Sequence, residues 1–331
     1  MRGRRVLLAA LAALAAAALA NFCLGASGVS VPDMARAVFA GDRESVAARV
    51  FFYVRLPRAA AAAVAGSALA VAGTLLQSVL RNPLAAPSVL GINSGAGLSA
   101  LVVMAFFPAA SGAVPVAAFA GACLAAFAVY ALARLTGASR TTIVLAGVAV
   151  NTLMSACMDA IVTLVPDAAV SRSAFSIGGF SAVTMKQIGF AVPFWLLGLL
   201  IAIAFRREME MMALGDDVAH SLGLRVERFR AVFLVAAAML AGAAVSFAGL
   251  LGFVGLIAPH LVKLLLKEDA RLAAPVSAVF GAALCLLCDL IARTAFAPYE
   301  LPVGIVLSFL GAPFFLWLLI RQKKRGRHDS I

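Results

Sequence analysis

The residues of this sequence that could do chemistry are few, and they lie in or beside strongly apolar segments. Cys285 and Cys288 have the C-x-x-C spacing of a metal or redox pair, but no third ligand lies near them in the sequence. Buried free cysteine packs as a small hydrophobic residue, so we expect these two to fill a contact between helices. No nucleophile converges with a base, and the sequence therefore predicts no catalytic residue and no metal site.

A second candidate is a polar stripe in residues 141–164. Every fourth position is small or polar: Gly147, Asn151, Ser155, Asp159 and Thr163. Steps of four drift by only about 40° on a helix, so these side chains share one face about 24 Å long. A carboxylate facing lipid is costly, so the face must turn toward other helices or toward a water-filled path. The pattern fits both a path lining and a helix–helix interface.

Arginines beside two apolar segments could bind carboxylates. Arg55 and Arg58 enclose Pro57, which suits the first turn of a helix. Their guanidinium groups either extend to lipid head groups or bind carboxylates of an outside partner. Arg293 follows Asp289 by four residues, a spacing that allows an ion pair on one helix face.

Membrane helices must position these residues. The chain has 331 residues, of which 64% are hydrophobic and only 13% are charged, as is typical of a polytopic membrane protein. A spanning helix needs about 20 apolar residues. We predict an all-α protein with one membrane domain, residues 1–331, and ten spans: 5–24, 57–79, 91–107, 114–134, 141–164, 187–205, 231–250, 252–266, 272–292 and 304–320.

Two of these spans come from one uninterrupted apolar block. Residues 231–262 contain no Asp, Glu, Lys or Arg. As a single helix the block would be about 48 Å long, which exceeds a hydrocarbon core of about 30 Å. The cluster of Gly249, Gly252 and Gly255 therefore predicts a break.

The basic residues predict the orientation. Most of the 27 Lys and Arg residues fall on one side when the N-terminus is cytoplasmic. This places both termini and residues 206–230 in the cytoplasm, and residues 25–56 outside. The net charge of +12 then reflects orientation and attraction to anionic lipid. It does not indicate nucleic-acid binding, because no basic face with interleaved aromatic residues occurs. Residues 18–20 resemble a signal-peptidase site, so removal of the first span is an alternative.

The most charged stretch is RREMEMMALGDDVAHSLGLRVERFR, residues 206–230. Two short helix-like pieces, 209–214 and 216–222, are separated by Gly215 and followed by Gly223. A compact, structured loop of this kind in a membrane protein usually binds a partner. The sequence has no G-x-x-x-x-G-K-[ST] motif, so energy from ATP would have to come from another subunit.

Six stretches resemble the permease subunits of type II ABC importers for iron siderophores, haem and cobalamin (FecCD-type). They are RLPR (55–58), Gln77 with RNPLAAPSVLGINSGAG (81–97), LAGVAV (145–150), LGDDVAHSLGL (214–224), GFVGLIAPH (252–260) and ELPVGIVLSFLGAPFFLWLL (300–319). They follow one another along almost the whole chain. The resemblance implies ten spans per subunit, a homodimer or close heterodimer around a central path, two cytoplasmic ATPases and an external binding protein.

The resemblance also implies roles for particular residues. Contacts with the ATPase fall to Leu214, Gly215, Ala219, Leu222 and Gly223. Docking of the binding protein falls to Arg55, Arg58 and Arg293. The inner gate falls to Asn82, Leu84, Thr141 and Thr142, and the path lining to Gly147, Asn151, Ser155 and Asp159. Residues 175–179, FSIGG, lack the tryptophan common in this segment of the family, so the segment does not indicate the substrate.

We therefore expect a multi-pass permease of the inner membrane that moves an iron chelate by alternating access. Ferric siderophore is the favoured substrate, with haem and cobalamin as alternatives, and a homodimer is the favoured assembly. We expect a transport subunit that is not an enzyme and binds no cofactor, with ATP and Mg held by the partner ATPase. A proton-coupled secondary transporter working through Asp159 is the rival from another class.

Overall fold

The computed structural model describes residues 2–24, 32–33, 36, 45–135, 140–266 and 270–326, and in these residues all regular structure is helical. Seven helical segments there are long and apolar enough to cross a membrane. They contain α1 (Arg2–Cys23), α4 (Leu56–Val79), α6 (Val114–Leu135), α7 (Arg140–Leu164), α9 (Met185–Ala204), α12 (Val226–Ala248) and α14 (Ala273–Thr294). Three shorter apolar helices are α5 (Ile92–Phe106), α13 (Val254–Leu266) and α15 (Val303–Gly326). Each of the ten predicted spans coincides with one of these helices, while ten membrane crossings remains a prediction.

Short elements connect these helices. They are α3 (Val46–Val50), the π-helical turn η1 (Phe51–Arg55), η2 (Pro87–Leu90), η3 (Pro108–Ala113), α8 (Ala168–Ile177), α10 (Arg206–Leu214), α11 (Asp216–Ser221) and η4 (Ala270–Leu272).

Helix α4 forms the centre of the bundle, and nearly all of its residues are buried. It packs tightly on two neighbours through pairs of glycines. A Cβ atom at Gly73 would lie 1.8 Å from the carbonyl oxygen of Gly255 on α13, and one at Gly66 would lie 2.2 Å from that of Gly281 on α14. Lipid provides little hydrophobic drive for helix association, so such close contact between small residues supplies the packing energy. Cys285 and Cys288 are also buried in α14, as the packing interpretation requires.

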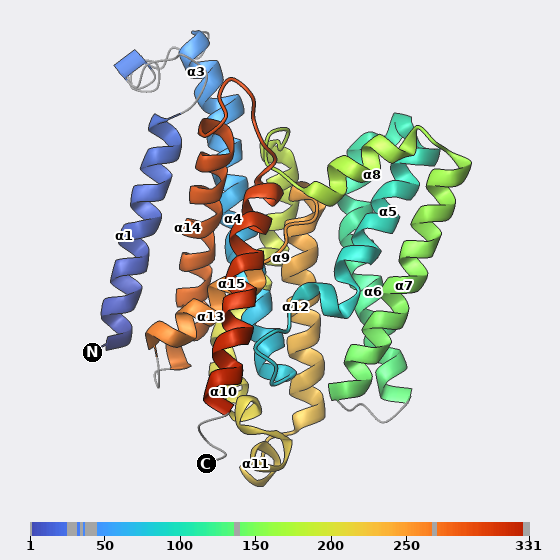
Figure 1. Ribbon diagram of the computed structural model, residues 1–331, viewed down its shortest axis with the longest axis vertical. Coiled ribbons are helices and arrows are strands. Elements are labelled where there is room, and N and C mark those ends of the chain that lie inside the picture. The colour runs from blue at the N-terminus through green and yellow to red at the C-terminus, as the bar shows by residue number, and fades with distance from the viewer. Residues whose placement is uncertain are drawn as a thin grey trace.

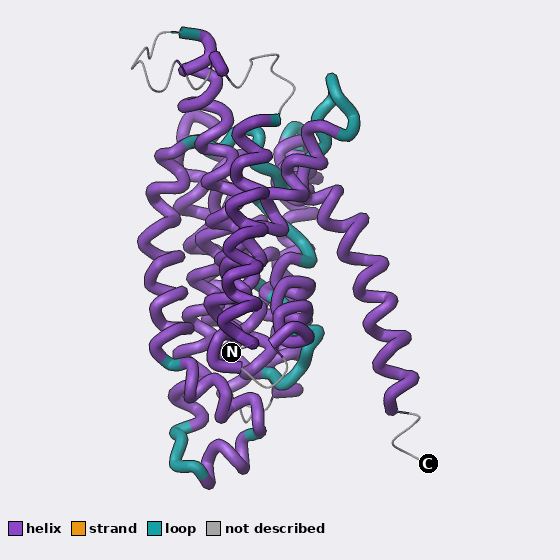
Figure 2. The backbone as a smooth tube through the Cα atoms, turned by 90° about the vertical axis from the view of Figure 1, so that its left-hand side faces the viewer, coloured by secondary structure: helices purple, strands orange, loops and turns teal. Residues whose placement is uncertain are grey.

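The remaining helices surround this centre (Figure 1). Helices α1 and α14 lie on one side of α4, whereas α5, α6, α7 and α8 form a group on the other side. The first residues of α1 and the last turn of α15 lie at the same end of the bundle as α10 and α11. This arrangement agrees with the predicted placement of both termini beside residues 206–230. Figure 2 shows that the C-terminal half of α15 stands apart from the rest of the bundle.

The second span begins earlier than predicted. Helix runs without interruption from Val46 to Val79, passing through η1, whereas we expected it to begin at Pro57. Pro57 has no N–H to donate, and a π-type turn directly before it lets the helix continue through this interruption. Much of the predicted outer segment, residues 25–56, lies outside the described residues.

The uncharged block 231–262 breaks at the predicted glycines. Helix α12 ends at Ala248, and Gly249 has a φ of 67°, a conformation that glycine adopts readily. The chain then pairs with the end of α8: the Leu250 amide donates to Phe175 O at 2.9 Å, and the Gly179 amide donates to Ala248 O at 2.8 Å. These bonds therefore hold the end of α8 against the end of α12, where the break begins.

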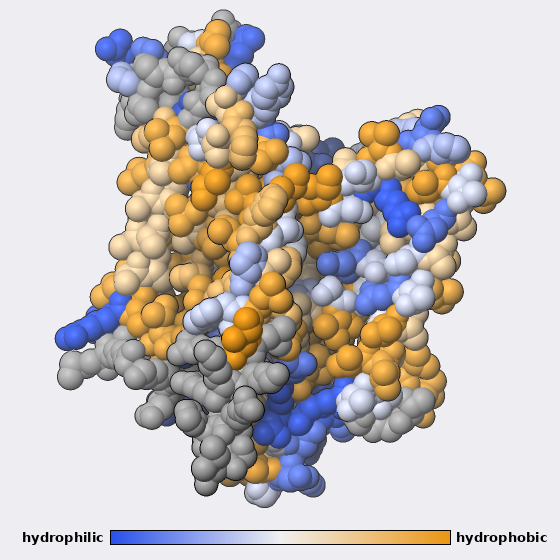
Figure 3. Space-filling model, viewed as in Figure 1, coloured by the Kyte–Doolittle hydropathy of each residue, from blue (hydrophilic) through white to orange (hydrophobic). Residues whose placement is uncertain are grey.

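The surface matches a protein that crosses a bilayer. Figure 3 shows hydrophobic residues over the flanks of the bundle and hydrophilic residues gathered toward its two ends. A hydrophilic area also lies on the viewer's side between α15 and the group formed by α7 and α8.

Candidate functional site: loop between α9 and α12, polar helix face and buried arginines

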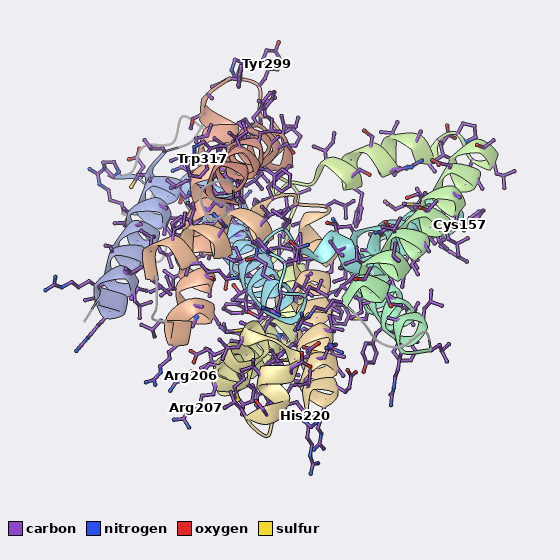
Figure 4. The ribbon with its side chains drawn as sticks, turned by 60° about the horizontal axis from the view of Figure 1, so that its bottom comes forward. Cys157, Arg206, Arg207, His220, Tyr299 and Trp317 are labelled. Atoms are coloured by element: carbon purple, nitrogen blue, oxygen red, sulfur yellow. The ribbon has the colours of Figure 1, made fainter. Side chains whose placement is uncertain are left out.

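The loop between α9 and α12 has the predicted helix–glycine–helix form. Helix α10 ends at Leu214, and α11 begins at Asp216 after Gly215, whose φ of 126° is accessible essentially to glycine alone. Gly223, with φ 84°, ends the second piece, and the Leu224 amide donates to Ala219 O at 3.0 Å. The two glycines thus fold a charged loop into a compact unit, which Figure 4 shows with Arg206 and Arg207 extending outward from it.

The exposed apolar side chains of this loop differ in part from those expected. Leu214, Val218 and Leu222 are exposed, while Ala219 has an exposed fraction of 0%. Ala219 therefore packs inside the loop and cannot itself contact an ATPase, which corrects the expectation for that residue. Val218 was missed, although its spacing of four residues from both leucines was a usable signal.

An ion-pair network ties the loop to two long helices. The carboxylate of Asp216 accepts from Arg140 Nη2 at 2.6 Å and from Arg230 Nη2 at 2.8 Å, one guanidinium at each oxygen. Arg140 is the first residue of α7, and Arg230 is a buried residue of α12 that also bonds to Glu227. Sequence reasoning found none of these pairs; the two partners of Asp216 lie 76 and 14 residues away along the chain, whereas the Arg230–Glu227 pair has a local i,i+3 spacing.

The first predicted gate segment forms a stiff turn. Asn82 Oδ1 accepts from the Leu84 amide at 2.9 Å, and Asn82 O accepts from the Ala85 amide at 3.0 Å. Arg81, just before this turn, has a φ of 47°, which few residues other than glycine adopt. The second gate segment, Thr141 and Thr142, lies in the first turn of α7.

The inner half of the polar stripe on α7 packs against other elements. A Cβ atom at Gly147 would lie 1.9 Å from Val89 O, so only glycine permits this contact with η2. Asn151 Nδ2 donates to Ser88 O at 2.9 Å, and Ser94 Oγ of α5 donates to Asn151 Oδ1 at 2.7 Å. These two stripe residues therefore serve as a helix interface.

The outer half of the stripe is more open. Asp159 Oδ1 accepts from Arg172 Nη1 of α8 at 2.6 Å, and both side chains are partly exposed. Thr163 Oγ1 donates to Asp159 O at 2.8 Å, and Ser155 is half-buried. The sequence left open whether the stripe is a helix interface or a path lining. Gly147 and Asn151 pack against other elements, whereas Ser155 and Asp159 leave polar groups exposed.

A cavity of about 770 Å³ lies between α5, α8 and α15. Residues from α5, α8, the break after α12 and α15 line it: Asn93, Ser176, Ile177, Leu250, Gly252, Gly304, Ile305, Ser308, Phe309, Ala312 and Pro313. Asn93 of α5 is next to Ser94, which bonds to Asn151 of α7, so α5 connects the cavity wall to the polar helix face.

The three predicted docking arginines are buried near the start of α4 and the end of α14. Arg58 Nε donates to both oxygens of Asp289 at 2.9 and 3.1 Å, and its Nη1 donates to Glu300 at 2.6 Å. Arg293 Nη2 donates to Asn21 of α1, at 2.6 Å to its carbonyl oxygen and 2.9 Å to Oδ1. Arg55 donates to the carbonyl oxygen of Phe22. In this conformation the three side chains bond within the chain and do not extend to solvent.

The expected ion pair of Asp289 and Arg293 is present, and Asp289 has a second arginine partner. Arg293 Nε is 3.8 Å from Asp289 Oδ2, so the two are in reach. The closer partner is Arg58, on a different helix, at 2.9 Å. Asp289 therefore forms the ion pair within α14 that the spacing predicted and also joins α14 to α4 through Arg58.

The profile of the FecCD transport family matches residues 12–321. The chain belongs to the FecCD transport family. It is a transport component, the permease of an ABC importer in the iron-chelate, haem and cobalamin group, and the ATPase is a separate subunit.

Two curated relatives illustrate the range of this family. The achromobactin transport system permease protein CbrC of Dickeya dadantii is 40% identical over 329 residues, covering 96% of this chain and 92% of the relative. The hemin transport system permease protein HmuU of Yersinia pestis is 37% identical over 286 residues, covering 83% and 84%.

A solved structure shares the fold over nearly its full length. It is an inward-facing conformation of a metal-chelate type ABC transporter, with a TM-score of 0.84 and 26% sequence identity, covering 96% of this chain and 99% of the other.

Proposed function

We propose that this chain forms a homodimer in the inner membrane and imports an iron chelate by alternating access. In this proposal it has ten spans with both termini in the cytoplasm, two ATPase subunits bind inside and a binding protein docks outside. Ferric siderophore is the favoured cargo, and haem and cobalamin are the alternatives. The relatives named for achromobactin and hemin and the metal-chelate structural relative support this substrate class.

The cytoplasmic loop carries the proposal. Leu214, Val218 and Leu222 expose apolar side chains on a compact unit that is otherwise strongly charged. An exposed apolar cluster with a polar rim is typical of a protein-binding surface. It lies at the end of the bundle where α1 begins and α15 ends. We assign this surface to the ATPase, which supplies the ATP and Mg that this chain has no motif to bind.

The path runs along the polar face of α7 in this proposal. Ser155 and Asp159 line its outer part, and Gly147 and Asn151 hold the inner part of α7 against η2 and α5. The cavity of about 770 Å³ between α5, α8 and α15 and the separated half of α15 support an opening beside α5, the helix to which Asn151 bonds. Asn82, Leu84, Thr141 and Thr142 then form the gate at the cytoplasmic end.

In this proposal the binding protein docks on the outer arginines by replacing one of their carboxylate partners within the chain. Glu300 is the most accessible member of the network, with 41% of its side chain exposed. A carboxylate of the binding protein could replace it on Arg58 Nη1 without exposing Asp289. Arg55 and Arg293 bond to α1, so they would transmit this event to the neighbouring helix.

The substrate is tested by reconstitution. The permease is placed in proteoliposomes with its ATPase and binding protein, and uptake of radiolabelled ferric citrate, a ferric hydroxamate, hemin and cobalamin is compared. We expect ATP-dependent uptake of one of the iron chelates. Uptake of cobalamin alone, or of no compound in the panel, would contradict the proposed cargo.

A further inference from the structure

The junction between α10 and α11 contacts the arginine that directly precedes each segment assigned to the inner gate. A Cβ atom at Gly215 would lie 2.9 Å from Nη1 of Arg81, so this guanidinium group lies against the junction. The next residue, Asp216, accepts from Arg140 Nη2 at 2.6 Å. Arg81 directly precedes Asn82, and Arg140 directly precedes Thr141. Two consecutive residues of the cytoplasmic loop thus meet the two arginines that lead into the gate segments.

Asp216 is held from a second side by a fixed anchor. Its other oxygen accepts from Arg230 Nη2 at 2.8 Å. The Arg230 side chain is only 3% exposed and belongs to α12, whose residues from Phe233 onward are mostly buried in the bundle. Hydrogen bonds between charged groups are about twice as strong as neutral ones. The carboxylate therefore links the start of α7, at the edge of the bundle, to its interior.

Movement of α11 must act on this carboxylate. Helix α11 has only six residues and lies between Gly215 and Gly223, and glycine restricts the backbone less than any other residue. Its exposed apolar side chains give a partner the means to displace it. Any such displacement either carries Arg140, and with it the first turn of α7, or breaks the bond between Asp216 and Arg140.

We propose that Asp216 is the positioning residue that transmits movement of the cytoplasmic loop to α7 and the inner gate, through Arg140 and against Arg230. The inference rests on the proposed function, because it assumes an ATPase that moves α11. Coupling of this kind requires an element with two arrangements that both sites influence. The Asp216–Arg140 pair, at 39% and 25% side-chain exposure, is accessible enough to open and close.

The adjacent acidic residue provides a matched control. Asp217 follows Asp216 on the same helix and is exposed. Asp217→Asn removes the same charge from the same short helix without touching Arg140 or Arg230. Asp216→Asn removes the charge that both arginines bind, and Asp216→Glu retains it.

The experiment uses the complete transporter in proteoliposomes, with the ATPase and binding protein present. The probe is whichever of radiolabelled ferric citrate, a ferric hydroxamate, hemin or cobalamin the unchanged protein imports. The measured quantity is the number of molecules imported per ATP hydrolysed, together with the amount of ATPase that co-purifies. We expect Asp216→Asn and Arg140→Gln to lower this ratio about five-fold or more while the ATPase remains bound and active.

The remaining variants complete the test. Asp217→Asn should keep the ratio of the unchanged protein, and Asp216→Glu should recover part of it. The double variant Asp216→Asn with Arg140→Gln should lose no more than Asp216→Asn alone, because Asp216→Asn already removes the interaction with Arg140.

Two results would overturn the inference while leaving the proposed function intact. One is an unchanged ratio in Asp216→Asn. The other is loss of the ATPase from the purified complex in both single variants, since Asp216 would then be a structural residue. If the unchanged protein shows no ATP-dependent uptake, the proposed function itself fails, and the inference fails with it.

Discussion

Replacement of Asp289 tests whether the outer ion network holds the bundle together. Its side chain is 0% exposed, both oxygens accept from Arg58 Nε, and Arg293 lies 3.8 Å away. Asp289→Asn keeps the shape of the side chain but removes its negative charge. In the described network this is the only buried carboxylate, and it lies between the buried guanidinium groups of Arg58 and Arg293. Breaking a buried pair in this way costs about 3–5 kcal/mol. The control Glu300→Gln removes a partly exposed partner of the same Arg58, which costs about 1 kcal/mol or less.

Thermal unfolding in detergent measures this difference. Trp195 is a suitable fluorescent reporter because its Nε1 donates to Ser67 Oγ of α4 at 3.1 Å. At about 2 °C per kcal/mol, Asp289→Asn should lower the Tm by about 6–10 °C, and Glu300→Gln by about 2 °C or less. Adding Arg58→Met to Asp289→Asn should recover part of the loss. If Asp289→Asn destabilises no more than Glu300→Gln, the network is not the constraint that we infer.

Two further predictions concern helix packing and the cytoplasmic loop. Gly73→Ala should destabilise the protein by about 3 kcal/mol, because the added methyl group collides with Gly255 O, whereas Gly112→Ala should be tolerated because no atom lies within 4 Å of its Cβ position. Thermal melts of the two variants check this, and equal Tm values would refute the glycine contact. Val218→Glu and Leu222→Glu should each reduce co-purification of the ATPase at unchanged permease yield. Full recovery of the ATPase with both would exclude this surface as its binding site.

Local patterns in the sequence predicted the elements of this fold well. The lengths of the apolar segments predicted the positions of the long helices. The glycine cluster that begins at Gly249 predicted the break in the uncharged block, and Gly215 and Gly223 predicted the ends of the two short helices between α9 and α12. Each of these signals lies within a few residues of the feature that it predicts. The early start of the second span was missed because Pro57 usually begins a helix, and no local signal revealed the π-turn before it.

The polar contacts between helices could not be predicted in the same way. Arg58 and Asp289 are 231 residues apart, so their pairing depends on which helices are neighbours in space. The sequence does not show which helices are neighbours, so Arg58 was predicted to bind carboxylates of an outside partner. Asp216 was missed for the same reason, because only the folded chain shows its partners on α7 and α12. Ala219 was expected to contact a partner because the sequence does not show that it is buried.

Energy coupling is the most direct test of the central claim that this chain is the permease of an ATP-driven importer. Proteoliposomes containing the permease are assayed for uptake of the transported chelate under two conditions. In one, the ATPase, the binding protein and ATP are present; in the other, only a proton gradient is imposed. We predict uptake in the first condition alone. Robust uptake driven by the proton gradient without the ATPase would contradict the account and would favour a proton-coupled transporter working through Asp159.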